Sequence, residues 1–358
     1  MPGPALWRHA AFVVMNVANR GDYNMRRRDL GLGLLAMPAL GRGARAEAST
    51  VRIVRQIGLP HLPLMVMEHE KLVEKHAARL GLPSLVTSWA TLGGPGAMID
   101  GLLSGQVDFG VVGAPGLLTL WDKTVGTARE VRALSCVQLQ PFLLVTNNPD
   151  VKTIADFTEK DRIAVPTAKI SAQALCLQVA AAQLWGDANY ERLDPLTVTL
   201  GHPEAAAGVM SGKSPINSHY AVSPFYYYEL ATQGVHLVLK SSETFGGNHV
   251  NGTLVAAPGF AKENPVITAA VLAAQEEVNQ LIGSHPEDVA RIYIDSARDT
   301  HGVEEMTRII VDPDNVWTTV PQKLMVFASF MHTVGRLKHM PAAWTDMFLP
   351  NVHGGQGS

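Results

Sequence analysis

Hydrophobic positions between residues 50 and 260 follow two spacings in turn, which predicts alternating strands and helices. The first segment, Val51–Ile57, alternates apolar and polar residues and is rich in β-branched side chains, as strands are. A loop with two prolines, Gly58–Pro63, precedes apolar residues at helical spacing from Leu64 to Leu80. The segments predicted as strands are 51–57, 85–90, 106–112, 134–140, 161–166, 196–200, 235–239 and 252–257.

Helices are predicted between these strands, and they dominate the chain after Pro265. The predicted helices are 64–80, 97–104, 171–184, 203–211, 266–282, 286–296, 303–310 and 321–337. Strands that alternate with helices over short connections are typical of a parallel α/β sheet. The chain crosses at Pro141–Val145 into a second stretch of the same pattern and returns through Gly252–Ala257.

This pattern predicts an α/β fold of two lobes, each a mostly parallel sheet flanked by helices. We assign residues 50–140 and 250–358 to lobe 1 and residues 141–249 to lobe 2. Residues 1–46 are assigned to a leader that is not part of either lobe.

The leader has the three-part order of a secretory signal. A basic cluster, Met25–Asp29, precedes an uncharged apolar run, Leu30–Leu40, and the segment ends in Ala44-Arg45-Ala46. The apolar run is too short to cross a bilayer. We therefore expect export to the periplasm; a frayed amphipathic helix is the alternative interpretation.

Two details of the leader stay open. The pair Arg27-Arg28 loosely fits a twin-arginine signal, and Sec export is the other route. Residues 1–24 fit a signal poorly, and we interpret them as an upstream extension with Met25 as the true start.

Composition excludes several classes of protein. The 358 residues carry 29 Lys+Arg against 32 Asp+Glu with no basic stripe, which argues against a nucleic-acid binder. Only two cysteines are present, too few for a disulfide scaffold, a four-cysteine zinc site or an iron–sulfur cluster. No stretch after the leader reaches the roughly 18 uncharged apolar residues of a membrane span, so the mature protein is expected to be soluble.

Three apparent catalytic or metal motifs fail on spacing or context. His69 and His76 are seven residues apart, too far for one zinc ion on one helix face, so a solvated charged face is favoured. The run ending in Gly212-Lys213-Ser214 lacks the first glycine of a P-loop, because Ala207 stands there. Gly31-x-Gly33 lies in the leader rather than after a strand. We predict no catalytic residue, no metal and no cofactor.

Four segments resemble a known family in the expected order: Val51–Pro60, Gly101–Gly113, Lys152–Phe157 and Val255–Val266. The second contains Leu102-x-x-Gly105-x-x-Asp108 and is the most specific. The chain is similar over most of residues 50–300 to the periplasmic substrate-binding proteins of ABC importers for nitrate, sulfonate, taurine and thiamine precursors.

The resemblance implies a type II periplasmic-binding fold with two crossing strands and a ligand in the cleft between the lobes. It implies two partners, a small-molecule solute and the membrane permease of an ABC importer, and a monomeric receptor. The solute classes it implies are small polar or anionic organic molecules of sulfonate, nitrate-like, carboxylate or pyrimidine type. Arg55 and Arg162 lie within predicted strands, where we expect them to face solvent, so a neutral or singly charged solute is preferred over a dianion.

The family commonly holds its ligand with the loops at strand ends, which here are 59–61, 93–96, 113–115, 167–171 and 218–220. Physical chemistry agrees, because helix N-termini at such loops offer unpaired N–H groups and positive dipole ends. The candidate ligand-binding residues are His61, Gly94, Pro95, Ala114, Pro115, Thr167, Lys169, Ser171, His219, Tyr220 and Asn251.

Each candidate has a structural alternative. Ser171 could be an ordinary helix cap beside a solvated Lys169, and His61 a surface-loop histidine. Most of the aromatic run Phe225–Tyr228 is expected to pack in the core, because four consecutive side chains cannot point one way. The isolated Trp89 and Trp121 could stack on a ring of the ligand, and core packing is the favoured interpretation for both.

Two other functions stay open. The first is an enzyme resembling thiamine-pyrimidine synthases, which share the fold but carry a cysteine-rich run that this chain lacks. The second is a ligand-sensing periplasmic subunit of a signalling system.

Overall fold

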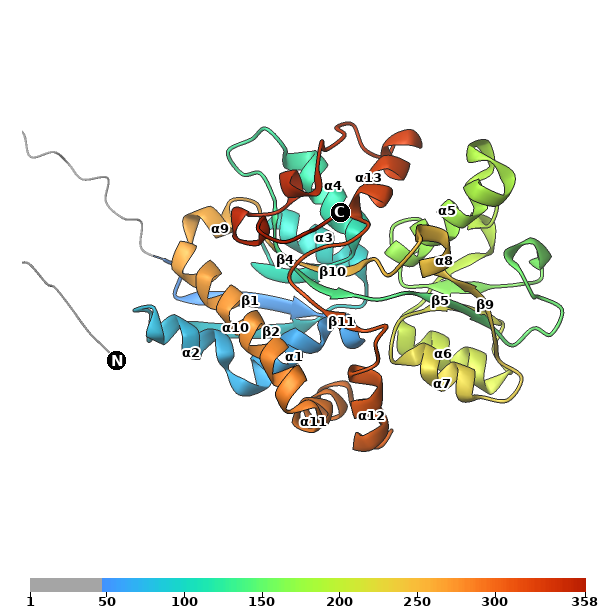
Figure 1. The fold of residues 1–358 in the computed structure, drawn as a ribbon, viewed down its shortest axis with the longest axis horizontal. Helices are drawn as coiled ribbons and strands as arrows, with labels where there is room; N and C mark the ends of the chain where they lie inside the picture. The colour runs from blue at the N-terminus through green and yellow to red at the C-terminus, as the bar shows by residue number, and fades with distance from the viewer. Residues whose placement is uncertain (1–46) are drawn as a thin grey trace, which may run out of the picture. The chain divides into compact units, whose positions relative to one another are not determined.

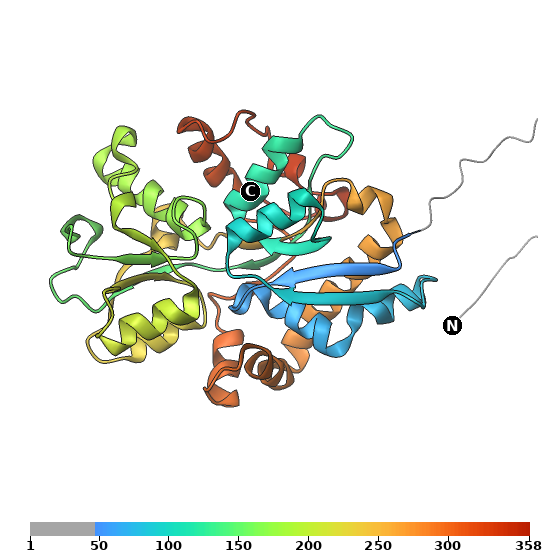
Figure 2. The same ribbon diagram turned by 180° about the vertical axis from the view of Figure 1, so that it is seen from behind.

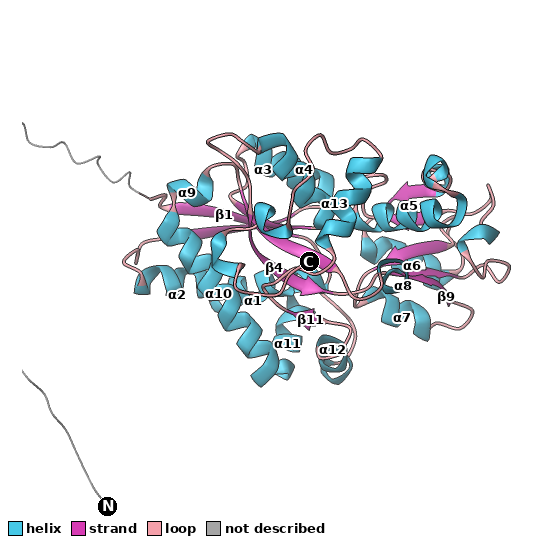
Figure 3. Ribbon diagram, turned by 45° about the horizontal axis from the view of Figure 1, so that its top comes forward, coloured by secondary structure: helices cyan, strands magenta, loops and turns pink. Residues whose placement is uncertain are grey.

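Two separate β-sheets organise residues 47–358, which are the residues that the computed structural model describes. The predicted leader, 1–46, lies outside them. Figure 3 shows the strands gathered in two groups with helices around each. The first sheet has the strand order β11-β4-β10-β3-β1-β2 and the second β7-β6-β8-β5-β9. The predicted two-lobed α/β fold is confirmed.

The first sheet is built from both ends of the described chain. Its strands are β1 (Thr50–Arg55), β2 (Val86–Thr91), β3 (Phe109–Val112), β4 (Ala133–Leu139), β10 (Val250–Ala256) and β11 (Val316–Trp317). Strand β1 pairs in parallel with β2 and β3, while β10 runs antiparallel between β3 and β4. The return strand β10 therefore lies in the middle of the sheet, where both its faces are covered.

Helices cover both faces of the first sheet (Figure 1). The helices of this lobe are α1 (Leu62–Glu70), α2 (Leu72–Arg79), α3 (Pro95–Ser104), α4 (Ala114–Thr124), α9 (Phe260–Glu263), α10 (Pro265–Ser284), α11 (Pro286–Ala297), α12 (Val303–Ile310) and α13 (Leu324–Thr333). Helices α3, α4 and α13 lie on one side and α1, α2 and α10 on the other. Lys71, at φ 52°, divides the single helix predicted over 64–80 into α1 and α2. Short 3-10 turns η1 (Leu59–His61), η5 (Trp344–Met347) and η6 (Pro350–Val352) complete the lobe.

The second sheet lies wholly within residues 143–240. Its strands are β5 (Leu143–Thr146), β6 (Ile163–Val165), β7 (Thr197–Thr199), β8 (Ser218–Ala221) and β9 (His236–Lys240). Helices α5 (Ala172–Trp185) and α8 (Ser241–Phe245) lie on one face, and α6 (His202–Ser211) and α7 (Phe225–Ala231) on the other, as seen from behind in Figure 2. Three 3-10 turns connect them: η2 (Ile154–Asp156), η3 (Asp187–Asn189) and η4 (Asp194–Leu196).

Three further differences between the predicted and observed elements concern β8, α4 and α13. Residues 218–220, predicted as a ligand loop, are the buried strand β8, whose Ser218 pairs with Thr146 of β5. Helix α4 was not predicted, because Pro115 and Gly116 read as a turn; proline is nevertheless well suited to the first turn of a helix. The predicted helix 321–337 is shorter, since α13 begins at Leu324 and ends at Thr333.

Apolar side chains of the two lobes form one continuous buried cluster. Helices α4 and α5 pack against each other, and Trp121 of α4 and Leu175 of α5 both belong to this cluster. Trp121 is therefore a core residue, as are Phe225, Tyr226 and Tyr228, each under 8% exposed. The free cysteines Cys136 on β4 and Cys176 on α5 are buried, and burial raises both thiol pKa values, that of Cys136 to about 12. Among residues 47–358, no helix combines the length and apolar character that a bilayer crossing needs.

Asp108 is the last residue of the Leu102–Asp108 pattern and directly precedes β3; its side chain forms hydrogen bonds with Arg52 of β1. Its carboxylate accepts from the Arg52 backbone N–H at 2.7 Å, from Nε at 2.9 Å and from Nη2 at 2.6 Å. Asp108 is 3% exposed, so these bonds satisfy a carboxylate that has little access to water. The residue that best carries the sequence resemblance thus has a structural role here.

Replacing Asp108 by Asn should lower the free energy of unfolding by about 2 kcal/mol, because the charged acceptor of three hydrogen bonds is lost. Chemical denaturation measures this. Asp100→Asn, which alters an exposed carboxylate on α3, is the matched control and should change stability little. Equal effects of the two substitutions would contradict the structural role of Asp108.

Candidate functional site

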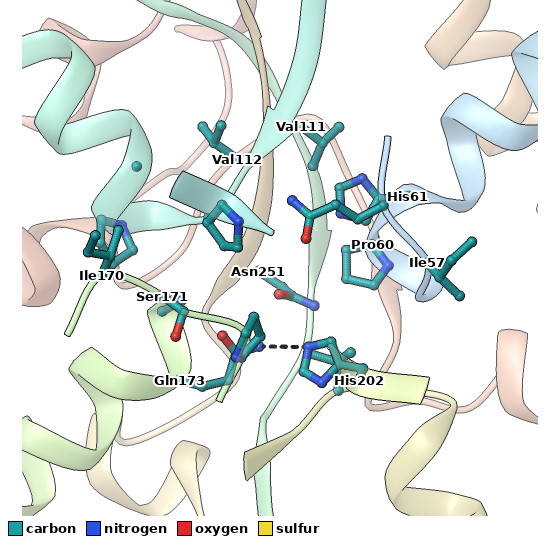
Figure 4. A pocket seen from close by; sticks show the side chains of 18 residues that line it. Ile57, Pro60, His61, Val111, Val112, Ile170, Ser171, Gln173, His202 and Asn251 are labelled. Carbon is teal, nitrogen blue, oxygen red and sulfur yellow. Dashed lines mark hydrogen bonds between the residues drawn. The ribbon is translucent and has the colours of Figure 1, made fainter. Parts of the chain in front are cut away.

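A cavity of about 60 Å³ lies between the two lobes, at the ends of strands from both sheets. Figure 4 shows the 18 residues that line it. Lobe 1 contributes Gln56, Ile57, Pro60, His61, Pro95, Val111, Val112, Gly113, Pro115, Gly116 and Asn251. Lobe 2 contributes Pro166, Ile170, Ser171, Ala172, Gln173, His202 and Val222. The site therefore needs both lobes.

Four helices begin at this cavity. Pro95 and His202 are the first residues of α3 and α6, Ala172 is the first of α5, and Pro115 is the second of α4. The first turn of each helix leaves backbone N–H groups without intrahelical partners and carries the positive end of the helix dipole. Four such ends around one small space favour a negatively charged guest.

Ser171 caps α5 as the sequence predicted, since its Oγ accepts from the Ala174 N–H at 3.3 Å. The cap residue also lines the cavity, so the two interpretations of Ser171 are compatible. The cap itself is 1% exposed, which shields the helix end from bulk water.

His61 is not a solvated loop residue. It is 7% exposed in the turn η1, and its Nδ1 has no hydrogen-bond partner among the described residues. Burial, with the electrostatic effects of Arg55 and His202 as smaller causes, lowers the pKa of His61 to about 3. The ring is therefore neutral at physiological pH, and its unpartnered nitrogen belongs to a residue that lines the cavity.

Arg55 corrects one expectation. It was expected to face solvent, but its side chain is 12% exposed and its Nε donates to Glu68 Oε2 at 2.9 Å. The strand pattern could not show this, because Glu68 reaches Arg55 from the following helix α1. Arg55 does not line the cavity.

Asn251 lies on β10, under the cavity, and is held by a network of carboxamides. Its Nδ2 donates to Gln140 Oε1 at 2.8 Å and to Gln138 Oε1 at 3.3 Å. Asn315 in turn accepts from both glutamines. These groups are buried, so the network fixes the orientation of the Asn251 side chain.

Four predicted site residues do not line the cavity, although each is next in the chain to a residue that does: Gly94, Ala114, Thr167 and Lys169. Gly94 is extended at φ −178°, and a Cβ there would lie 3.2 Å from the Pro166 carbonyl oxygen and from Thr167 Oγ1. The glycine thus permits close approach of the lobes. Ala114 is fully buried at the start of α4. Lys169, at φ 66°, lines an adjoining hollow of about 250 Å³ that also contains Lys123, Arg336 and Asp100.

His219 and Tyr220 do not line the cavity. Both are 0% exposed within strand β8, and Tyr220 packs edge-to-face on Phe142. The expectation that they form a ligand loop rested on treating 218–220 as a connection, and the four-residue strand was too short to stand out in the sequence.

Gln173 and His202 line the cavity, although the sequence did not single them out. Gln173 Nε2 lies 3.5 Å from His202 Nε2, the contact drawn in Figure 4. One usable signal was present: Gln173 is the second residue after the predicted cap Ser171, and His202 follows Gly201 at a predicted strand-to-helix turn. Their pairing depends on tertiary structure.

No group of three or more metal-ligating side chains is found within the part of the chain that the structure describes. His69 is exposed, but His76 is not simply solvated, because its Nε2 lies 2.7 Å from Glu277 Oε2 of α10. The two histidines therefore serve different local contacts.

Comparisons with known proteins identify the fold. No protein-family model matches the chain, and no curated protein sequence matches it. Solved structures do match. The alkanesulfonate-binding protein SsuA from Xanthomonas axonopodis pv. citri, bound to MOPS, is similar at a TM-score of 0.64 and 16% identity, over 84% of this chain and 98% of that one.

Two further structures agree. The periplasmic aliphatic sulphonate-binding protein SsuA from Escherichia coli matches at a TM-score of 0.61 and 18% identity, over 85% of this chain and 92% of that one. The periplasmic nitrate-binding protein NrtA from Synechocystis PCC 6803 matches at 0.58 and 16% identity, over 84% of each chain. This chain therefore has the periplasmic-binding-protein fold.

The neutral state of buried His61 predicts a pH dependence of stability. Its folded pKa, about 3, is below the usual 6.5, so the unfolded chain binds this proton more readily. The contribution of neutral His61 to the free energy of unfolding is fully present above pH 6.5. It is lost as the pH falls toward 3, by about 1.4 kcal/mol per pH unit at most. His61→Gln should flatten the curve of unfolding free energy against pH by one proton. His69→Gln, at an exposed position, should not; parallel curves for wild type and His61→Gln would contradict the assignment.

Proposed function

We propose that this protein is an exported receptor that captures a small, singly charged anion between its lobes and delivers it to the membrane permease of an ABC importer. The observation that carries the proposal is the interlobe cavity onto which four helix N-termini open. The proposal assigns no catalytic residue. Export to the periplasm is part of it and rests on the leader sequence at 25–46.

The absence of charged side chains from the described lining of the cavity favours a monoanion over a dianion. None of the 18 lining residues is Asp, Glu, Lys or Arg. Attraction for an anion must therefore come from backbone N–H groups, helix dipoles and neutral side chains such as Ser171, Gln173 and His61. Dipoles can compensate one charge well, whereas a dianion is commonly met by arginine.

The size of the cavity favours a small solute. At about 10–15 Å³ per water-sized group, a space of about 60 Å³ accepts about four to six such groups. Nitrate and a one-carbon sulfonate fall in this range. The similar structures include a nitrate-binding protein and an alkanesulfonate-binding protein bound to MOPS, so both anion classes are bound on this fold.

The basic hollow beside the cavity supports the same charge preference. It shares Pro115 and Ile170 with the cavity, so the two spaces adjoin. Lys123, Lys169 and Arg336 outnumber the single Asp100 there, and such an imbalance raises the local concentration of anions.

We propose that lobe 1 (residues 50–140 and 250–358) and lobe 2 (residues 141–249) close on the solute. The hinge lies where the chain passes from β4 into β5 and where it returns through β10. Ligand that contacts both lobes shifts the equilibrium toward closure by its differential affinity. Three contacts between the lobes would hold the closed form: Lys240 with Asp314 at 2.7 Å, Tyr228 Oη with Asp299 at 3.1 Å, and Arg336 Nη1 with the Lys169 carbonyl at 2.9 Å.

Small anions should raise the melting temperature of the purified protein. At a concentration about a hundred times its dissociation constant, a bound ligand stabilises the fold by roughly 2.7 kcal/mol. A thermal-shift screen should cover nitrate, methanesulfonate, taurine and acetate, with chloride salts at equal ionic strength as reference.

A cavity-filling variant locates the effect. Ala172→Leu places extra carbon atoms in the cavity and should abolish the ligand-induced shift. Ala207→Leu makes the same change at an exposed site on α6 and should keep it. A shift that persists in Ala172→Leu would place binding elsewhere, and no shift with any anion would contradict the proposed function.

A further inference from the structure

A line of hydrogen-bonded side chains runs from the cavity into the interior of the second lobe. Gln173 Nε2 lies 3.5 Å from His202 Nε2, His202 Nδ1 lies 2.8 Å from His219 Nε2, and His219 Nδ1 lies 2.9 Å from Glu229 Oε1. These four residues come from α5, α6, β8 and α7. We call them the relay. Its outer end lines the cavity, and its inner end is a carboxyl group 0% exposed to solvent.

We propose that the relay couples anion binding in the cavity to protonation of Glu229. The inference deepens the proposed function and rests on it, because it concerns what controls binding at the same site. It goes further because it assigns a role to the buried residues His202, His219 and Glu229, which a cavity lined only by helix dipoles would not need.

The hydrogen-bond pattern of the relay has two possible directions. With Glu229 ionised, His219 Nδ1–H donates to Oε1, His202 Nδ1–H donates to His219 Nε2, and the Gln173 amide donates to His202 Nε2. Each ring is neutral and has one donor and one acceptor nitrogen. In this state the relay carries one negative charge, and its outer ring nitrogen is an acceptor.

Adding one proton to Glu229 reverses the direction. Its hydroxyl donates to His219 Nδ1, His219 Nε2–H donates to His202 Nδ1, and His202 Nε2–H becomes a donor. The amide of Gln173 must then turn so that its Oε1 accepts from His202 Nε2–H, which leaves the amide NH2 group as the donor at the cavity end. Both rings remain neutral, since each loses one N–H and gains the other. The relay is then uncharged and ends in a donor, which suits an anion better than the acceptor of the ionised state.

Burial supports the protonated state. Glu229 Oε2 has no hydrogen-bond partner among the described residues, so an ionised carboxylate would be incompletely satisfied. Burial raises the Glu229 pKa well above its usual value, and it lowers the pKa of His219 to about 3 and that of His202 well below normal. The added proton therefore belongs on the carboxyl group rather than on a ring.

Few other titratable groups face the relay. His61 of η1 lies near His202, and α5 has only Cys176. Two residues of β9, packed against α7, bond elsewhere: His236 to the Val151 carbonyl and Lys240 to Asp314. Glu204, on α6, is exposed. Strands β5 and β6 contribute no titratable side chain.

The test measures methanesulfonate binding by calorimetry between pH 5.5 and 9, because this probe keeps one charge throughout. Sulfonate buffers are avoided. Wild-type affinity should fall as the pH rises through the pKa of Glu229, by up to tenfold per pH unit. Binding in that range should take up as much as one proton, measured in two buffers of different ionisation enthalpy.

Glu229→Gln keeps the shape of the side chain but cannot ionise, so its affinity should not depend on pH in this range. Glu204→Gln, the matched control at an exposed carboxylate, should follow the wild type. Equal pH dependence of wild type and Glu229→Gln would overturn the relay while leaving the proposed function intact. If Glu229→Gln does not fold, absence of proton uptake by the wild type across the range overturns it.

A ligand-free measurement separates the relay from the proposed function. Since the pKa of Glu229 is raised in the folded state, wild-type stability should fall as the pH rises from about 4.5 through that pKa. Glu229→Gln should lack this fall. If the wild type binds no methanesulfonate at any pH, methanesulfonate is not a ligand of the cavity. If the unfolding free energies of wild type and Glu229→Gln depend on pH in the same way, the relay is overturned.

Discussion

Buried carboxamides at the passage between the lobes must all find hydrogen-bond partners, and the geometry of the site depends on how they do so. Gln140 stands directly after β4, where the chain leaves the first sheet, and its Oε1 accepts from Asn251 on the returning strand. The same oxygen accepts from the Ser223 N–H of the second lobe at 3.4 Å. The Ser223 carbonyl in turn accepts from the Leu59 N–H at 3.0 Å, at the start of the turn that carries His61. Leaving one of these groups unpaired would cost about 1–3 kcal/mol, which explains why one arrangement is specified.

Within residues 47–358, no charged side chain lines the space that this network supports. Arg55, whose charge acts on His61, is paired with Glu68, and His61 itself is held neutral by burial. What remains at the closed cavity is an assembly of helix dipoles, two from each lobe, whose directions within a lobe are fixed by the fold. Once the lobes meet, these dipoles are already oriented, so a small anion can be held without a formal counter-charge.

The sequence predicted the alternation of strands and helices, the crossing of the chain between the two sheets and the cap at Ser171, because these depend on local spacing and on one residue type at a helix start. It did not predict what depends on contacts between distant segments. The short strand β8 has only four residues, and its buried His219 is explained by Glu229 and His202, which belong to other elements. Arg55 was likewise misjudged because its partner lies 13 residues further along the chain. The starts of α3, α5 and α6 at the cavity were predictable, whereas that of α4 and the pairing of the side chains between these helices were not.

The two native cysteines are buried, one in each lobe, with thiols that resist ionisation. Maleimide dyes react through the thiolate, so the unmodified protein should accept such labels slowly. A pair of new surface cysteines, one on either side of the cleft, could then carry donor and acceptor fluorophores without first removing the natural ones. Opening and closing could be followed in single molecules on the otherwise unaltered chain.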